Sequence, residues 1–93
     1  MDFKFYFDRT LNDIHISKHH VSKEEIHEFF NEVLYLEIQR EDNSFESIAK
    51  LSSERYLKII YRKQLDNTYF IITAFDIFDS YEKNLIEKEL NKS

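Results

Sequence analysis

The absence of glycine and proline constrains this chain more than any other feature, since its 93 residues contain neither. Average usage would supply about six Gly and about five Pro in a chain of this length. Turns that need a positive φ must therefore use Asn, Asp, Ser or His. A glycine-rich phosphate loop, a dinucleotide-binding fingerprint and the usual nucleophile elbow are all excluded.

The length predicts a single domain over residues 1–93, with one core between two layers. Nine Phe and six Tyr supply much of that core, because each large aromatic side chain buries roughly 150–250 Å². Without Cys the chain has no disulfide and no thiolate metal ligand. No apolar run approaches the roughly 20 residues of a membrane span, and the apolar start is too short for a secretory signal. We therefore expect a soluble, cytoplasmic protein with no membrane contact and no cofactor.

The first part of the chain predicts a strand and two helices. Residues 3–7 alternate weakly and indicate a strand. Asp8 is a good N-cap, and the apolar residues after it predict a short helix that runs to about His19. Ser22 and Glu25 form a capping box that opens a second helix. The inward face of this second helix is the strongest periodic signal in the chain and comprises Ile26, Phe29, Phe30, Val33 and Leu34.

The second part predicts a meander and a last helix. Residues 34–40 turn extended, and strands are expected over residues 45–51, 55–63 and 68–75. Asp79 opens the last helix, whose expected inward residues are Tyr81, Leu85, Ile86 and Leu90. The predicted fold class is therefore α+β, with an N-terminal strand, two helices, an antiparallel meander sheet of three to four strands and a C-terminal helix.

The joint between the first two predicted helices has a purely structural interpretation. With the first helix ending at His19, His20 takes the position after the helix where a left-handed conformation is common. Val21 then meets Ile16 in the hydrophobic contact of a Schellman ending. Placing His instead of Gly there costs about 1 kcal/mol of left-handed strain. His15 and His19 are spaced as i and i+4, but no third ligand accompanies them, so no metal site is assigned.

Charge is distributed unevenly along the chain. The net charge of −5 argues against an isolated nucleic-acid binder, because phosphate neutralisation dominates such affinity. Residues 23–46 hold eight acids and two bases, whereas residues 50–63 hold five bases and one acid. One face of the strand over residues 55–63 is expected to carry Tyr56, Lys58, Ile60 and Arg62. An aromatic side chain beside two cations can stack a base and hold a phosphate, although a solvated face of extended Lys and Arg gives the same pattern.

Three groups of residues follow one another in a recognisable order. The first is Phe7-Asp8, Lys18-His19, Val21-Ser22 and Glu24-Glu25; the second is Ile48-Ala49-Lys50, Arg55, Leu57 and Ile59-Ile60-Tyr61; the third is Ile71-Ile72-Thr73-Ala74. In order and spacing, over residues 7 to about 90, they resemble the BrnT-type toxins of the RelE-like ribonuclease superfamily and neighbouring small uncharacterised bacterial domains of similar pattern. The chain differs from that family in its acidic net charge, in His20, where the family has Gly, and in Phe75, where the toxins usually carry Arg.

The resemblance implies a small bacterial ribonuclease toxin that cleaves messenger RNA and is neutralised by an antitoxin protein. Such cleavage needs a base for the ribose 2′-hydroxyl, an acid for the leaving oxygen and cations for the phosphate. His19 is the acid/base candidate of the matched motif at pH 7. The candidate catalytic residues are His19, Lys18 and Arg62, and the candidate RNA-binding residues are Lys50, Arg55, Tyr56 and Lys58.

A second hypothesis comes from a different functional class. The chain would be a catalytically silent module that binds an antitoxin-like protein, or a second copy of itself, through its aromatic-rich surface. The arrangement of the cations in the structure distinguishes the ribonuclease hypothesis from the interaction-module hypothesis. The ribonuclease hypothesis requires Lys50, Lys58 and Arg62 to converge on one outward surface near His19, and cations held against carboxylates would contradict it.

Overall fold

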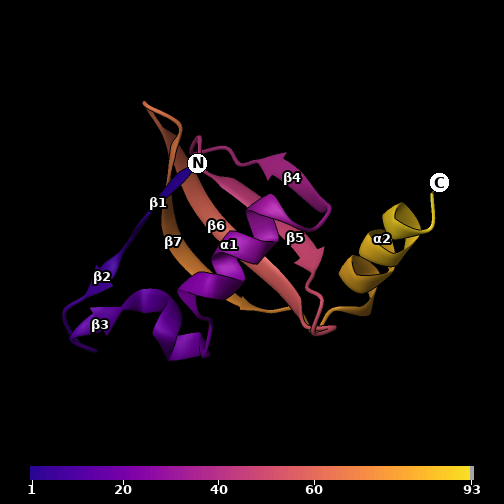
Figure 1. Ribbon diagram of the computed structural model, residues 1–93, viewed down its shortest axis with the longest axis horizontal. Coiled ribbons are helices and arrows are strands. Elements are labelled where there is room, and N and C mark those ends of the chain that lie inside the picture. Colours follow the sequence, from indigo (N-terminus) through magenta and orange to yellow (C-terminus); the bar gives the residue numbers. More distant parts are fainter. Residues whose placement is uncertain (93) are drawn as a thin grey trace.

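The computed structural model describes residues 1–92, which form an α+β fold (Figure 1). In chain order, the elements are β1 (Asp2–Phe5), β2 (Phe7–Asp8), β3 (Asp13–Ile14), the 3₁₀ helix η1 (His15–His19), α1 (Lys23–Asn31), β4 (Tyr35–Gln39), β5 (Phe45–Lys50), β6 (Tyr56–Gln64), β7 (Thr68–Asp76) and α2 (Ser80–Leu90). The predicted α+β fold class is therefore confirmed for residues 1–92, but of the three predicted helices only the second and the last are α-helices.

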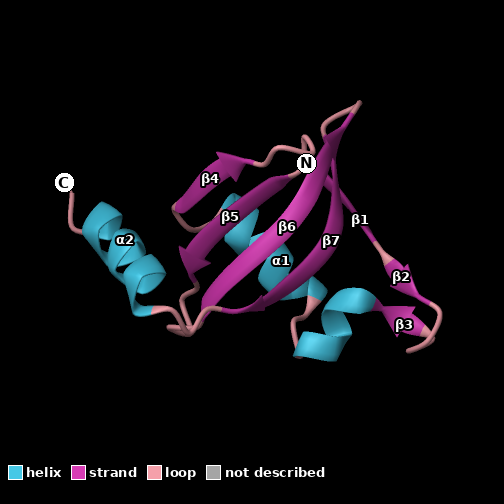
Figure 2. Cartoon of the chain, turned by 180° about the vertical axis from the view of Figure 1, so that it is seen from behind, coloured by secondary structure: helices cyan, strands magenta, loops and turns pink. Residues whose placement is uncertain are grey.

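The main sheet has five strands in the order β1-β7-β6-β5-β4 (Figure 2). The strands β4 to β7 form the predicted antiparallel meander. The N-terminal strand differs from the prediction, because it ends at Phe5 and pairs in parallel with β7 at the far edge. The sheet is therefore mixed, and β1 and β4 are its two edge strands.

The predicted helix over residues 8–19 is wrong in its first half. Residues 7–14 form a small hairpin of β2 and β3, and only His15–His19 turn helically, as η1. Asp8 caps a turn instead of a helix, because its carboxylate accepts hydrogen bonds from the backbone N–H of Thr10 (2.9 Å) and Leu11 (3.4 Å). Asn12 then takes a φ of 57°, which a right-handed helix does not allow.

The predicted joint is confirmed in detail. His20 is left-handed (φ 58°, ψ 36°), and the backbone N–H of Val21 donates to the carbonyl oxygen of Ile16 at 3.2 Å. Both apolar residues of this Schellman ending are buried. Ser22 and Glu25 form the reciprocal capping box that starts α1. The chain therefore passes from η1 into α1 without a glycine at the left-handed position.

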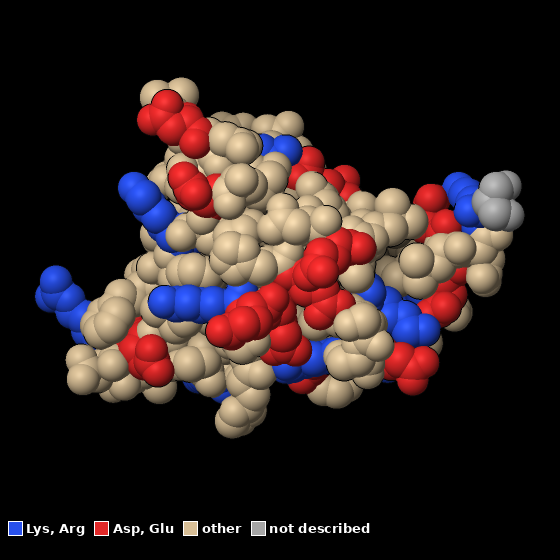
Figure 3. Space-filling view, in the orientation of Figure 1, with Lys and Arg blue, Asp and Glu red and all other residues tan. Residues whose placement is uncertain are grey.

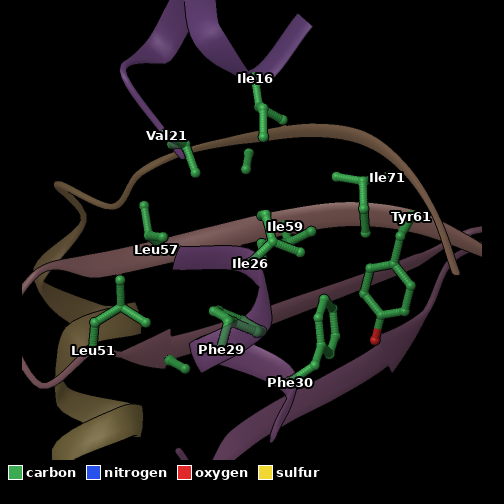
Figure 4. Close-up of a cluster of buried hydrophobic side chains, with 12 residues drawn as sticks. Ile16, Val21, Ile26, Phe29, Phe30, Leu51, Leu57, Ile59, Tyr61 and Ile71 are labelled. Atoms are coloured by element: carbon green, nitrogen blue, oxygen red, sulfur yellow. The ribbon is translucent and has the colours of Figure 1, made fainter. Parts of the chain in front are cut away.

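The core lies between α1 and one face of the sheet, which we call the inner face (Figure 4). Ile26 and Phe29 of α1 are fully buried beside Leu57, Ile59 and Tyr61 of β6. Aromatic contacts extend this cluster towards β1 and β4, where Phe30 lies within 5.5 Å of the rings of Phe3, Tyr35, Tyr61 and Tyr69. Many of the chain's aromatic side chains therefore pack together in this cluster.

The end of α1 corrects one part of the periodic prediction. The helix stops at Asn31, so Leu34 leaves the inward stripe and is exposed, while Val33 remains packed against the core. The chain needs this early exit because Tyr35 already pairs with Ala49 as the first residue of β4.

The second helix covers only part of the opposite, outer face. In α2, Ile86 is buried against Ile48 and Ile77, with Leu85 packed beside them. Tyr81 and Leu90 were predicted to face inward but are exposed, because α2 sits at the margin of the sheet, beside β5 (Figures 1 and 2). Within residues 1–92, neither helix has the length and apolar character needed to cross a membrane.

In the described part of the chain, residues 1–92, six residues have a positive φ in the absence of glycine: Asn12, His20, Asn43, Glu54, Asp66 and Asn67. Five of the six are Asn, Asp or His, as the composition predicts, and Glu54 is the exception. Each lies in a turn or at a helix end, where a left-handed residue reverses the chain.

Replacing His20 with Gly should raise the free energy of unfolding by up to about 1 kcal/mol, because Gly has no Cβ to strain the left-handed conformation. Urea denaturation measures this change as a higher midpoint at constant slope. As a control, Lys18→Gly lies inside η1 and should instead destabilise the protein. A lower midpoint for H20G would contradict the assignment of strain to this residue.

Candidate functional site

Arg55 is the most heavily used cation among the predicted site residues. Its Nε donates to Asp76 Oδ1 at 2.6 Å, and its Nη1 donates to both carboxylate oxygens of Glu25 at 2.9 and 3.0 Å. The same guanidinium donates to the carbonyl oxygens of His20 (2.9 Å) and His19 (3.1 Å). Hydrogen bonding to Asp76 is the main cause that raises the pKa of Arg55. Arg55 therefore joins β6, β7, η1 and α1.

Lys50, Lys58 and Arg62 lie on the outer face, as the alternation of the strands predicts, but each faces carboxylates. Lys50 Nζ lies 3.1 Å from Glu87 Oε2, and a hydrogen bond to Glu87 is the main cause that raises its pKa. Tyr56 donates its hydroxyl to the same Glu87 oxygen. Acidic partners from α2 therefore neutralise this end of the outer face.

The other two cations are paired in the same way. Lys58 Nζ lies 2.6 Å from Glu82 and 3.5 Å from Glu46. Arg62 lies 3.6 Å from the carboxylate of Asp42 and also donates to its carbonyl oxygen. The expectation of a free cationic surface is therefore contradicted.

Arg62 and His19 are also not brought together. Arg62 pairs with Phe70, whereas the ring of His19 lies 5.9 Å from that of Phe75. These two positions on β7 are about 17 Å apart along the strand, at about 3.4 Å per residue. Arg62 and His19 therefore do not form the shared catalytic arrangement that the sequence analysis required.

A second set of polar side chains gathers where η1 meets the end of β7, and we call Asp8, His15, Lys18 and His19 the histidine corner. His15 Nδ1 lies 3.1 Å from Asp8 Oδ2, and the rings of His15 and His19 are 5.6 Å apart. Lys18 is exposed beside them. Lys18 and His19 were predicted as catalytic residues. The spacing of His15 and His19 and the Phe7-Asp8 motif were noted in the sequence, but the contact of Asp8 with His15, which the hairpin brings about, was not predicted.

Hydrogen bonding, burial and neighbouring charges set the protonation states of the side chains in the histidine corner. The hydrogen bond from His15 is the main cause that holds the pKa of Asp8 below its usual value. The ionised carboxylate only accepts hydrogen bonds, so the facing Nδ1 of His15 carries a proton. Burial, then the charges of His15 and Lys18, lower the pKa of His19. His19 is therefore neutral at pH 7 and free to accept a proton.

A depression of about 540 Å³ lies beside the histidine corner. Its lining includes Lys18, His19, His20, Phe75 and Phe78. Phe78 is 84% exposed, which offers a flat aromatic surface for stacking. Within residues 1–92, no group of three or more His, Asp or Glu side chains is arranged to hold a metal ion.

A groove of about 420 Å³ separates α2 from β4 and β5 on the outer face. Leu36 and Ile38 of β4 form one wall, and Tyr81 and Leu85 of α2 form the other. Ile38 is 60% exposed and Tyr81 is 69% exposed. We call this feature the α2 groove. The α2 groove was not predicted from the sequence, because Tyr81 was expected in the core and residues 34–40 showed no strong pattern of apolar residues.

The ion pair of Lys58 with Glu46 and Glu82 lies in the lining of the α2 groove, together with Asp79. Three acids and one base therefore surround an apolar interior, so the groove has an excess of negative charge. This arrangement suits a partner surface that is apolar and positively charged.

Comparisons with known proteins add no family assignment to this geometry. No protein-family model, no curated protein and no solved structure matches the chain. The resemblance to the BrnT-type toxins therefore stays a prediction from sequence motifs, and function has to be argued from the two sites described above.

Replacing Arg55 with Leu should lower the free energy of unfolding by about 2–3 kcal/mol, because it leaves two carboxylates and two carbonyl groups without their shared donor. Denaturant titration measures this loss. The matched control Arg62→Leu breaks an exposed pair and should cost less than about 1 kcal/mol. Equal losses in the two variants would show that Arg55 does not fasten the fold.

Proposed function

We propose that this protein is a small protein-interaction domain and that its partner binds in the α2 groove. The observation that carries the proposal is a pair of large, exposed apolar side chains, Ile38 and Tyr81, on facing walls of that groove. Large exposed aromatic and aliphatic side chains that line a concavity are the usual anchors of protein interfaces. An antitoxin-like protein, which the family resemblance implies, is one candidate partner.

The ion pairs of the outer face favour this function over RNA binding across the sheet. A phosphate that approached Lys50 or Lys58 would have to displace Glu87, or Glu46 and Glu82, from within 3.5 Å of the ammonium group. The whole chain also carries a net charge of −5. Both features oppose the phosphate neutralisation on which RNA affinity depends.

Replacing Ile38 with Lys should weaken partner binding at least tenfold, because a charged side chain replaces an apolar anchor in the groove. The measurement compares proteins retained from host extract by wild type and by I38K, followed by titration of the retained partner. Leu65→Lys is the matched control, since Leu65 is 88% exposed in the β6–β7 turn, outside the groove lining. A partner that binds wild type, I38K and L65K equally would refute the groove as its site.

RNA cleavage at the histidine corner, without Lys50, Lys58 and Arg62, is a second candidate function. It differs from the arrangement expected from the sequence, and the contact between Asp8 and His15 beside His19 favours it. In this scheme the neutral imidazole of His19 takes the proton of a ribose 2′-hydroxyl, whose oxygen attacks the adjacent phosphorus. The P–O5′ bond breaks, and the leaving 5′-oxygen takes a proton from the protonated imidazole of His15, which Asp8 orients. Lys18 faces the phosphate, and Phe78 stacks a base. The products are a 2′,3′-cyclic phosphate and a free 5′-hydroxyl.

If the histidine corner cleaves RNA, His15→Ala and His19→Ala should each reduce the rate on a single-stranded oligonucleotide about 100-fold or more. His27→Ala is the matched control, because His27 is an exposed histidine of α1 outside the corner. The lowered pKa of His19 keeps it unprotonated to lower pH, so the acid limb of the pH–rate profile should fall below the ordinary histidine pKa of about 6.5. Intact RNA after incubation with wild-type protein would eliminate this candidate.

A further inference from the structure

The strand β4 has one unpaired edge next to the α2 groove. It is the last strand in the sheet order and pairs only with β5 among residues 1–92. The backbone N–H of Arg40 donates to Ser44 O at 2.7 Å, which fixes the alternation of the β4–β5 ladder. The residues that bond to β5 are therefore Leu36 and Ile38. The N–H and C=O groups of Tyr35, Glu37 and Gln39 consequently point away from the sheet.

This edge carries few of the features that protect edge strands from pairing with another chain. Such strands are usually defended by Lys, Pro, bulges or charged residues that point inward. The segment Tyr35–Gln39 contains neither Lys nor Pro, and its pairing with β5 is regular over all five residues. The one charged side chain, Glu37, is already bound by the hydroxyl of Tyr61 and by Lys63.

A strand added at this edge would place its side chains alternately on the two faces of the sheet. Side chains on the outer face would extend the row of Leu36 and Ile38 into the α2 groove, opposite Tyr81. Side chains on the inner face would lie beside Glu37, which is paired with Lys63, and towards α1, whose Phe29 and Phe30 pack against Tyr35 of β4. Figure 3 shows acidic side chains gathered over α1 on this face, and Glu24, Glu28 and Glu32 are the acids of its solvated stripe.

We propose that the partner enters as a β-strand that pairs with β4, and that apolar residues alternate with Lys or Arg along it. This inference rests on the proposed interaction function, because it specifies what occupies the α2 groove. Backbone hydrogen bonds to Tyr35, Glu37 and Gln39 supply affinity, and the alternating side chains supply specificity. The apolar residues fill the groove, and the basic residues face the acidic inner side.

A second copy of this chain fits the same edge less well. Antiparallel pairing of two β4 strands centred on Glu37 would place the two Glu37 residues opposite each other, which is unfavourable. Each copy also carries a net charge of −5. Charge complementarity therefore favours a basic partner over self-association.

The test uses a fluorescent, acetylated and amidated nine-residue peptide in which Val alternates with Arg. Wild-type protein should bind it by fluorescence anisotropy. Gln39→Pro, which removes one outward N–H at an exposed edge position, should weaken binding at least tenfold. Gln39→Ala, the matched control, keeps that N–H and should bind within about threefold of wild type.

A peptide methylated on alternate backbone nitrogens should lose binding to wild-type protein, which tests strand pairing without altering the fold.

The outcomes separate this inference from the proposed function. Loss of binding in I38K but not in Q39P, together with full binding of the methylated peptide, would place a partner in the groove without strand pairing and overturn only the inference. Failure of wild-type protein to bind the alternating peptide would overturn the partner chemistry. A dimer in sedimentation experiments that Q39P dissociates would make a second copy the occupant and would also overturn the proposal.

Discussion

A single guanidinium joins the start of β6 to β7, α1 and η1, whose contacting residues lie 21 to 36 positions away in the sequence. Arg55 immediately precedes β6, and it binds the end of β7 through Asp76, the first turn of α1 through Glu25, and the end of η1 through two carbonyl oxygens. The joint at His20 is attached to the sheet by the buried side chains of Ile16 and Val21 and by this guanidinium. Arg55 also bridges the end of η1 and the end of β7 beside the histidine corner, because it donates to His19 O and to Asp76. The cation that makes the most hydrogen bonds in the chain's described part is therefore a structural residue.

The parts of the fold that depend on local chemistry could be predicted from the sequence. The capping box at Ser22, the left-handed His20 and the three strands of the meander all follow from short-range patterns. The hairpin of β2 and β3 could not be predicted. An Asp residue such as Asp8 can cap either a helix or a turn, and the local sequence does not distinguish the two. The inward face of α2 was also mispredicted, since a helix at the margin of a sheet buries Ile86 and leaves Tyr81 in solvent.

The candidate sites were harder to predict because their partners are distant in sequence. Lys50 meets Glu87 across 37 residues, and Arg62 meets Asp42 across 20. Alternation along β6 predicted correctly which side chains share the outer face, but it could not show that acids from α2 and from the β4–β5 turn neutralise them. One signal was present, since the acidic run over residues 23–46 complements the basic run over residues 50–63. Opposite runs of this kind predict internal pairing as readily as they predict two separate surfaces.

The central claim is that the paired cations are structural and that recognition occurs at β4 and α2. Amide chemical-shift mapping by NMR tests this most directly, with the alternating basic peptide in one titration and a single-stranded RNA in another. The account predicts that the peptide shifts the amides of β4 and α2, and that RNA leaves the amides around Lys50, Lys58 and Arg62 unchanged. RNA-induced shifts centred on those three residues, with none from the peptide at β4, would contradict it.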